Sequence, residues 1–177
     1  DKQVANKSLH RDWEIRNFRS KNMAFKLSQR SFQRLVGVHP KLVETVKKAI
    51  KYTDVDFGVI FGVRDLATQE RLYKSGKSQT MKSKHLIQDD GYAHAVDLMA
   101  YDSGEPSWDI VDYDNIADAM RKAAQEVGIE LIWGAAWHKL LTVSPDTAEN
   151  LMNEYIDLRR SEGRRPFIDG PHFQLAT

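Results

Sequence analysis

Cysteine is absent from the 177-residue sequence, which excludes disulfide frameworks and zinc sites built from thiolates. A metal ion bound by this chain must therefore be held by carboxylates and by the six histidines. No run of residues approaches the roughly 20 apolar positions that a transmembrane helix needs, so we expect no stable membrane insertion. With 26 basic against 25 acidic residues, the chain also lacks the basic excess typical of nucleic-acid-binding domains, and we expect no nucleic-acid partner.

The rest of the composition is typical of a single folded domain. Hydrophobic residues make up 41% and charged residues 29% of the chain, and the length suits one hydrophobic core. The first 22 residues are polar and mixed in charge, without the apolar stretch of a secretory signal. We therefore expect residues 1–22 to be an extension or leader and residues 23–177 to form the domain.

Hydrophobic periodicity predicts helices and strands in an irregular order. Helices are predicted at 40–52, 68–74, 113–127 and 145–161, and strands at 55–63, 94–101, 130–133 and 173–175. A loop is predicted at 76–90 and a turn at 102–106. Because the elements do not follow a βαβ repeat, the sequence predicts a single α+β domain with a small, mostly antiparallel sheet flanked by helices.

Two separate stretches contain the residue types of a catalytic zinc site, which needs three protein ligands and an open position for water. His85 and Asp97 lie in the first stretch, and His172 lies near the end of the chain. The period of two along a strand places Ala95 and Asp97 on one face and His94 on the other. We therefore expect His94 to be structural, whereas His85, on the preceding loop, can fold back toward Asp97.

These segments resemble the M15 zinc peptidases, which include D-Ala-D-Ala carboxypeptidases and the L-alanyl-D-glutamate endopeptidases used as phage endolysins. The motifs are Ser83-x-His85, Ala95-x-Asp97 and a His172 that precedes a short strand. Segments 57–64, 132–137 and 169–173 resemble the endolysin branch in particular. The resemblance extends over about residues 25–175, and no single motif carries it alone.

The resemblance implies a fold of the D-Ala-D-Ala peptidase/Hedgehog-like type with a zinc ion in the sheet. It implies that the ion is held by His85, Asp97 and His172, that Asp169 is the general base, and that Arg64 and Gln69 bind substrate. Such an ion lowers the pKa of its bound water toward about 7, and a nearby carboxylate takes the proton as the water attacks an amide.

Three departures from the family pattern stand out. The gap between His85 and Asp97 is longer than usual, with an insertion through residues 88–91. Ala136 stands where the pattern usually has an aspartate. Residues 139–165 form a long insertion before the closing motif, which we expect to be helical and able to cover the cleft.

Other roles are open for several of these side chains. Asp169 precedes a glycine, as turn-forming aspartates commonly do, and Arg64 has Asp65 and Glu70 nearby for a surface ion pair. His138 is a competing metal candidate that could instead contact substrate. The basic run of Arg159, Arg160, Arg164 and Arg165 is typical of a solvated helix end, and it could also meet an anionic wall polymer or outer-membrane lipid.

The function implied by the resemblance is cleavage of peptidoglycan stem peptides between L-Ala and D-Glu. We expect a monomeric phage endolysin that stays in the host cytoplasm until lysis opens the inner membrane. The alternatives are a D-Ala-D-Ala carboxypeptidase or dipeptidase, whose pattern would place a glutamate at Asp169, and a non-catalytic zinc-binding domain of the same fold.

Overall fold

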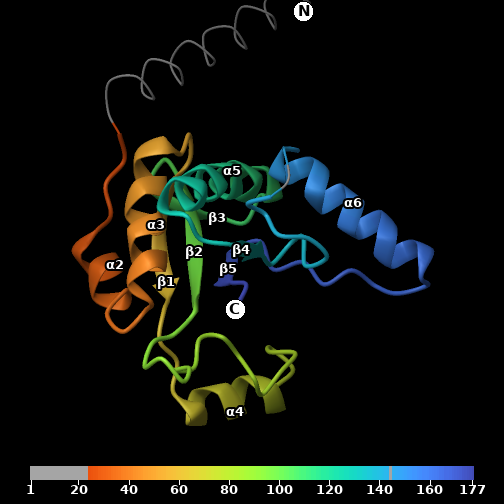
Figure 1. Cartoon of the computed structure of the whole chain (residues 1–177), viewed down its shortest axis with the longest axis horizontal. Helices are drawn as coiled ribbons and strands as arrows, with labels where there is room; N and C mark the ends of the chain where they lie inside the picture. Colours follow the sequence, from red (N-terminus) through yellow and green to blue (C-terminus); the bar gives the residue numbers. More distant parts are fainter. Residues whose placement is uncertain (1–23, 144) are drawn as a thin grey trace, which may run out of the picture.

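The computed structural model describes residues 24–143 and 145–177, so the extension predicted at 1–22 lies outside the described residues. Its helices and strands alternate irregularly along the chain (Figure 1). The helices are α2 (Gln29–Arg34), α3 (Pro40–Tyr52), α4 (Leu66–Lys74), α5 (Ile110–Val127) and α6 (Ala148–Ser161). The strands are β1 (Asp56–Phe61), β2 (Ala95–Asp102), β3 (Glu105–Ser107), β4 (Leu131–Trp133) and β5 (His172–Leu175).

The strands form one antiparallel sheet in the order β1-β2-β5-β4, with β3 paired to β2 outside this path. The pairing of β2 with β5 brings the end of the chain beside its middle, with Asp97 opposite His172. The predicted α+β class and antiparallel sheet are therefore confirmed.

Helices α3 and α5 pack against each other, and α5 also contacts β2 and β4. The first turn of α3 forms readily because Pro40 occupies its first position and the His39 ring accepts a hydrogen bond from the backbone amide of Lys41. The core between helices and sheet consists mainly of large apolar side chains with almost no exposure, among them Leu42, Phe57, Leu98, Met120, Trp133 and Phe173. These side chains cover one face of the sheet, and the candidate site lies on the other face.

Strand β3 occupies part of the segment where we predicted only a turn. Asp102 pairs with Glu105, so the connection is a two-residue hairpin loop in which Ser103 and Gly104 both have positive φ. That geometry is the favoured one for a tight hairpin. The prediction of a simple turn was wrong because a three-residue strand containing a proline shows no hydrophobic alternation.

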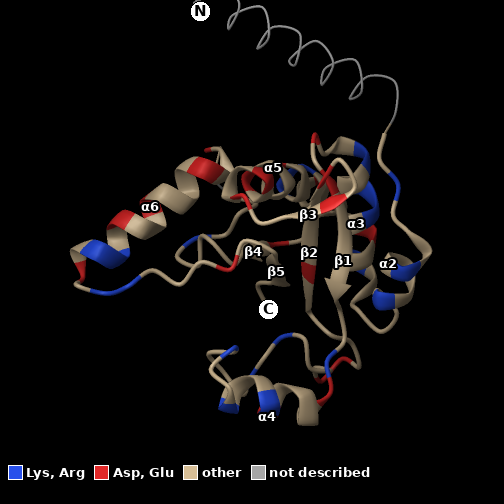
Figure 2. Ribbon diagram, turned by 180° about the vertical axis from the view of Figure 1, so that it is seen from behind, with Lys and Arg blue, Asp and Glu red and all other residues tan. Residues whose placement is uncertain are grey.

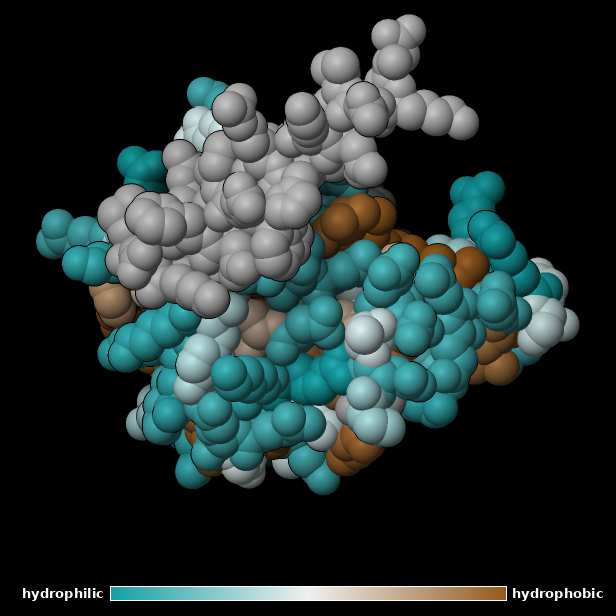
Figure 3. Space-filling view, turned by 90° about the horizontal axis from the view of Figure 1, so that it is seen from above, coloured by the Kyte–Doolittle hydropathy of each residue, from teal (hydrophilic) through white to brown (hydrophobic). Residues whose placement is uncertain are grey.

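Helix α6 lies within the segment 139–165 and extends away from the sheet (Figure 1). Its N-terminal half packs against α5 through buried side chains that include Leu151 and Met152. Helix α4 and the loop that follows it lie apart from the sheet at the bottom of Figure 1, and α6 lies at the right of the same view. Hydrophilic side chains cover most of the described surface in the view of Figure 3. Within the described residues, no helix has both the length and the apolar character needed to cross a membrane.

Candidate active site

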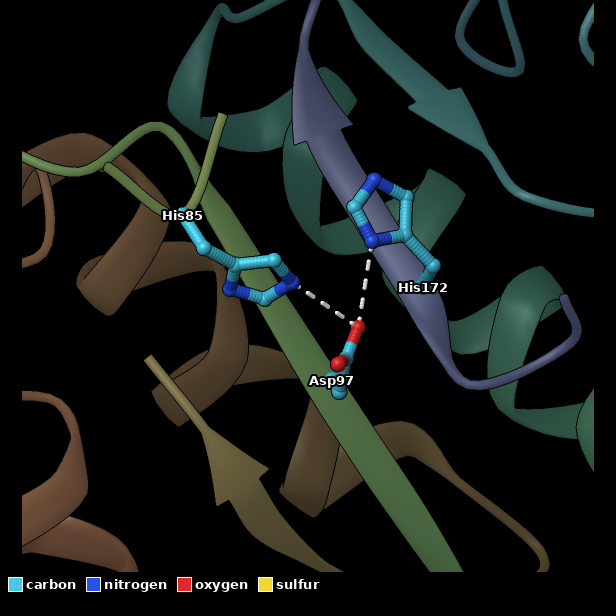
Figure 4. Close-up of side chains that lie close together, drawn as sticks. All are labelled: His85, Asp97 and His172. Atoms are coloured by element: carbon cyan, nitrogen blue, oxygen red, sulfur yellow. Dashed lines mark hydrogen bonds and ion pairs between the residues drawn. The ribbon is translucent and has the colours of Figure 1, made fainter. Parts of the chain in front are cut away.

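Three side chains from distant parts of the chain meet near the start of strand β2 (Figure 4). Asp97 comes from β2, His172 from the first position of β5, and His85 from the loop before β2. The Oδ1 atom of Asp97 lies 3.2 Å from Nε2 of His85 and 3.1 Å from Nδ1 of His172. The register of β5 against β2 brings Asp97 and His172 together across 75 positions, as the family resemblance implied.

Each histidine is oriented by a second hydrogen bond on its far nitrogen. Nδ1 of His85 lies 2.8 Å from the carbonyl oxygen of Gly62, and Nε2 of His172 lies 2.9 Å from Oε1 of Gln174. These partners accept hydrogen bonds from the rings, so the nitrogens that face Asp97 are the ones that would bind a metal ion, as in sites where the far nitrogen of a ligating histidine donates to a neighbouring acceptor. The sequence analysis did not identify Gln174 as a partner of His172, although its two-residue offset from His172 places both side chains on one face of the strand.

The three donor atoms have the chemistry and spacing of a metal site. They lie within 4.8 Å of one another, and the histidines are buried while Asp97 is partly exposed. Ligands of a tetrahedral ion with bonds of about 2.0–2.1 Å lie about 3.3 Å apart. The two measured separations to Asp97 are close to that value, so two imidazoles and a carboxylate suit an ion such as zinc with one position left open for water.

The electrostatics of the cluster favour an ionised aspartate. Burial alone would raise the pKa of Asp97, but its hydrogen bonds with His172 and His85 hold that pKa well below the ordinary value. Burial tends to lower the pKa of His172, and the bond to Asp97 more than offsets this and raises it. The two hydrogen bonds therefore favour the ionised form of Asp97, which is the form that binds a cation.

Asp169 lies beside the cluster on a turn fixed by strand β4. Its backbone amide donates to the carbonyl of Gly134 at 2.8 Å, and the His172 amide donates to the Asp169 carbonyl at 3.1 Å. A Cβ at Gly134 would lie 2.3 Å from the Asp169 carbonyl oxygen, so only glycine permits this approach. Trp133 also holds the turn, because its Nε1 donates to the carbonyl of Gly170 at 2.7 Å.

The pKa of Asp169 is raised, first by burial and then by the negative charge of Asp97. A raised pKa makes the carboxylate a stronger base than a solvent-exposed aspartate. Its turn position does not exclude this chemical role, since the side chain lines the same cleft as the three clustered residues.

Arg64 approaches the cluster from the segment between β1 and α4. Its Nη2 lies 3.8 Å from Oδ2 of Asp97, and its Nη1 donates to Oε1 of Gln69 at 2.9 Å. Gln69 is fully buried and uses its amide nitrogen on the hydroxyl of Ser78 and the carbonyl of Thr80. The structure thus places Gln69 behind Arg64, where it orients the guanidinium and fixes the loop that follows α4.

Other side chains lie beside this centre or away from it. Trp137 stacks on the His172 ring with centroids 5.4 Å apart. His138 lines the cleft but pairs with Glu154 at 3.2 Å and stands outside the three-residue cluster. His94 pairs with Asp90 at 2.7 Å, in keeping with the expected structural role. Ala136 is buried, so apolar packing occupies the position where a family aspartate is usual.

A cleft of about 1000 Å³ opens from the cluster. One wall comes from the segment after α4, residues 77–84, and the other from the C-terminal half of α6 and the chain that returns from it. Figure 2 shows basic residues at the end of α6 and along the segment after α4. The insertion that we expected to be able to cover the cleft thus lines one side of it, whereas the sequence did not indicate that residues 77–84 form the other side.

A family model described as phage L-alanyl-D-glutamate peptidase matches residues 23–176. The chain is 29% identical over 157 residues to the L-alanyl-D-glutamate peptidase of Escherichia phage T5, an alignment that covers 86% of this chain and 99% of that protein. The fold is similar to the crystal structure of the L-Ala D-Glu endopeptidase ChiX of Serratia marcescens, with a TM-score of 0.63 and 34% sequence identity. That match covers 88% of this chain and 93% of ChiX.

Proposed function

Because this chain belongs to the phage L-alanyl-D-glutamate peptidase family, we propose that it is an endolysin that cleaves peptidoglycan stem peptides between L-Ala and D-Glu with a zinc ion. The single observation that carries the metal dependence is the buried cluster of His85, Asp97 and His172, which offers two imidazole nitrogens and a carboxylate oxygen. No other group of this kind occurs among residues 24–143 and 145–177.

The proposed reaction is hydrolysis of an amide by water. A zinc ion at the cluster would supply a bound water of lowered pKa and a Lewis acid for the scissile carbonyl. The carboxylate of Asp169 accepts a proton from the attacking water and returns it to the leaving amine nitrogen. Its burial and its raised pKa suit this exchange, because a stronger base draws the proton more effectively near neutral pH.

Arg64 is the proposed contact for the substrate carboxylate closest to the cleaved bond. D-Glu has two carboxyl groups and only one continues the peptide chain, so every L-Ala–D-Glu peptide keeps a free carboxylate beside the scissile amide. The guanidinium presents a planar set of donors that suits such a group. Gln69 holds it in place, so we assign Gln69 an indirect part in substrate binding.

We further propose that the enzyme acts as a monomer and reaches the wall from the host cytoplasm once lysis begins. The cluster, Asp169 and Arg64 all come from one chain, so the proposed chemistry requires no second copy.

Digestion of purified Gram-negative peptidoglycan, followed by mass analysis of the fragments, tests this function. We expect release of stem peptides that begin at D-Glu, loss of release with a chelator, and recovery when zinc is restored. Removal of terminal D-Ala alone would instead assign a carboxypeptidase. A zinc-loaded protein that releases nothing would be a binding domain without catalysis.

A further inference from the structure

Both walls of the cleft carry positively charged side chains, although the net charge of the whole chain is close to zero. Six arginines and lysines line the cleft against three acidic residues. Two of those acids, Asp97 and Asp169, belong to the candidate active site, and the third is Glu162 at the end of α6. Away from the metal cluster the cleft is therefore strongly positive, whereas the chain as a whole has a formal charge of +1.

Four of these basic residues form what we call the outer basic cleft: Lys77, Lys82, Arg159 and Arg164. Within the described part of the chain, Lys77, Lys82 and Arg164 have no side-chain hydrogen bond or ion pair. Arg159 approaches Glu162 only at 4.0 Å, and its buried Nε has no hydrogen-bond partner there. Buried donors are normally satisfied, so the Nε of Arg159 has unused capacity for an anion, and Lys77, Lys82 and Arg164 are exposed cations beside it in the same cleft.

The α6 wall is held in place without using these charges. The backbone amide of Phe167 donates to the hydroxyl of Tyr155 at 3.2 Å, which fixes the returning chain against α6. Trp137 stacks on Phe167 and donates from Nε1 to its carbonyl at 3.2 Å. An apolar surface therefore lies between the metal cluster and the arginines, suited to the uncharged part of an extended peptide.

The substrate class of the proposed function has its charges on one side of the cleaved bond. L-Ala contributes no carboxylate after its carbonyl enters the scissile amide. The D-Glu carboxylate lies next to that amide, and the carboxyl end of a free stem peptide adds another carboxylate farther along. A volume of about 1000 Å³ is at the upper end for small-ligand pockets, so a peptide of several residues fits.

We propose that the outer basic cleft binds the C-terminal carboxylate of the stem peptide, with Arg159 and Arg164 as the main contacts. This inference rests on the proposed function and extends it, because it makes peptide length and the state of the carboxyl end determinants of cleavage. Positive charge on facing walls also concentrates anionic substrate before binding, an effect that salt weakens.

A pair of synthetic substrates tests the proposal: N-acetylmuramoyl tetrapeptides that end in D-Ala as a free carboxylate or as a carboxamide. For the wild-type enzyme loaded with zinc, we expect the carboxamide to raise KM about tenfold with little change in kcat, the size of a charge-assisted hydrogen bond at a partly exposed site. In Arg159→Gln/Arg164→Gln, the free carboxylate loses this advantage and both substrates have the same high KM.

The matched control is Arg160→Gln/Arg165→Gln, which removes the same charge from the same segment at residues that do not line the cleft. It should keep the wild-type difference between the substrates. Bound zinc and the thermal midpoint of each variant establish that the fold is retained.

An unchanged KM ratio in Arg159→Gln/Arg164→Gln, or an equal loss in the control, would overturn the inference while leaving the proposed function intact. Failure of the wild-type enzyme to cleave either tetrapeptide or peptidoglycan at L-Ala–D-Glu would overturn the proposed function, and this inference with it.

Discussion

The cluster of His85, Asp97 and His172 and the outer basic cleft are neighbouring regions built in opposite ways. In the cluster, each imidazole has a partner for both nitrogens, and the backbone is held by close contacts at Gly62 and Gly134. In the outer cleft, long side chains carry charges that have few partners in the described chain. The difference indicates a division of labour: the cluster is preorganised for one geometry, whereas the outer cleft keeps charged groups available for a ligand.

Removal of an imidazole from the cluster should have the largest effect on metal binding and hydrolysis. We expect His172→Ala to lose bound metal and to lower the rate of peptidoglycan hydrolysis by at least about 1000-fold, because two ligands cannot hold a catalytic ion in place. Metal content and hydrolysis are measured on the same preparation. Full zinc occupancy with normal activity would contradict the assignment of His172 as a ligand.

Asp169→Asn distinguishes a role in proton transfer from a role in metal binding. This change keeps the size of the side chain and removes the proton acceptor, so we expect hydrolysis to fall by about 10²–10⁴-fold while zinc stays bound. Isothermal titration with zinc and single-turnover digestion give the two readings. Loss of zinc together with activity would assign Asp169 to metal binding instead.

Gln174→Leu tests whether preorganisation of His172 matters beyond ligation itself. The change removes the acceptor that lies 2.9 Å from Nε2 of His172 and keeps a side chain of similar size. We expect zinc affinity to fall by about 10–100-fold, with activity restored at high zinc concentration. Equal zinc affinity in the variant and the wild type would show that the ring is oriented by packing alone, for example by its stack on Trp137.

The smallest expected effect comes from a substitution at Asp114, which differs from both regions because its side chain is buried but does not line the cleft. Burial, followed by the charges of Glu149, Asp118 and Asp109, raises its pKa to about 6. The folded state therefore binds the proton more tightly than the unfolded state, so its stabilising contribution is present at pH 4 and lost as pH rises through 6.

Asp114→Asn should accordingly raise the thermal midpoint at pH 7 by a few degrees and leave it nearly unchanged at pH 4. Thermal unfolding followed by circular dichroism at both pH values measures this. The same shift at both pH values would mean that packing, rather than ionisation, limits stability at this position.

Periodicity and spacing were sufficient for the parts of the site that depend on local geometry. The strand period assigned Asp97 to the face opposite His94, and Pro40 marked the first residue of α3. The meeting of Asp97 with His172 came from the family resemblance, because periodicity within one strand does not determine which strand pairs with it. Likewise, no local pattern shows that Gln69 supports Arg64 or that α6 faces residues 77–84, since both depend on the packing of distant segments.

The pairing of β2 with β5 also bears on the fidelity of folding. Because side chains alternate across a sheet, a slip of one residue would turn His172 into the core and bring Phe173 to the cluster. An error in strand pairing and the loss of the metal centre are therefore the same event. An ion that bound only the correctly paired strands would favour those molecules by mass action.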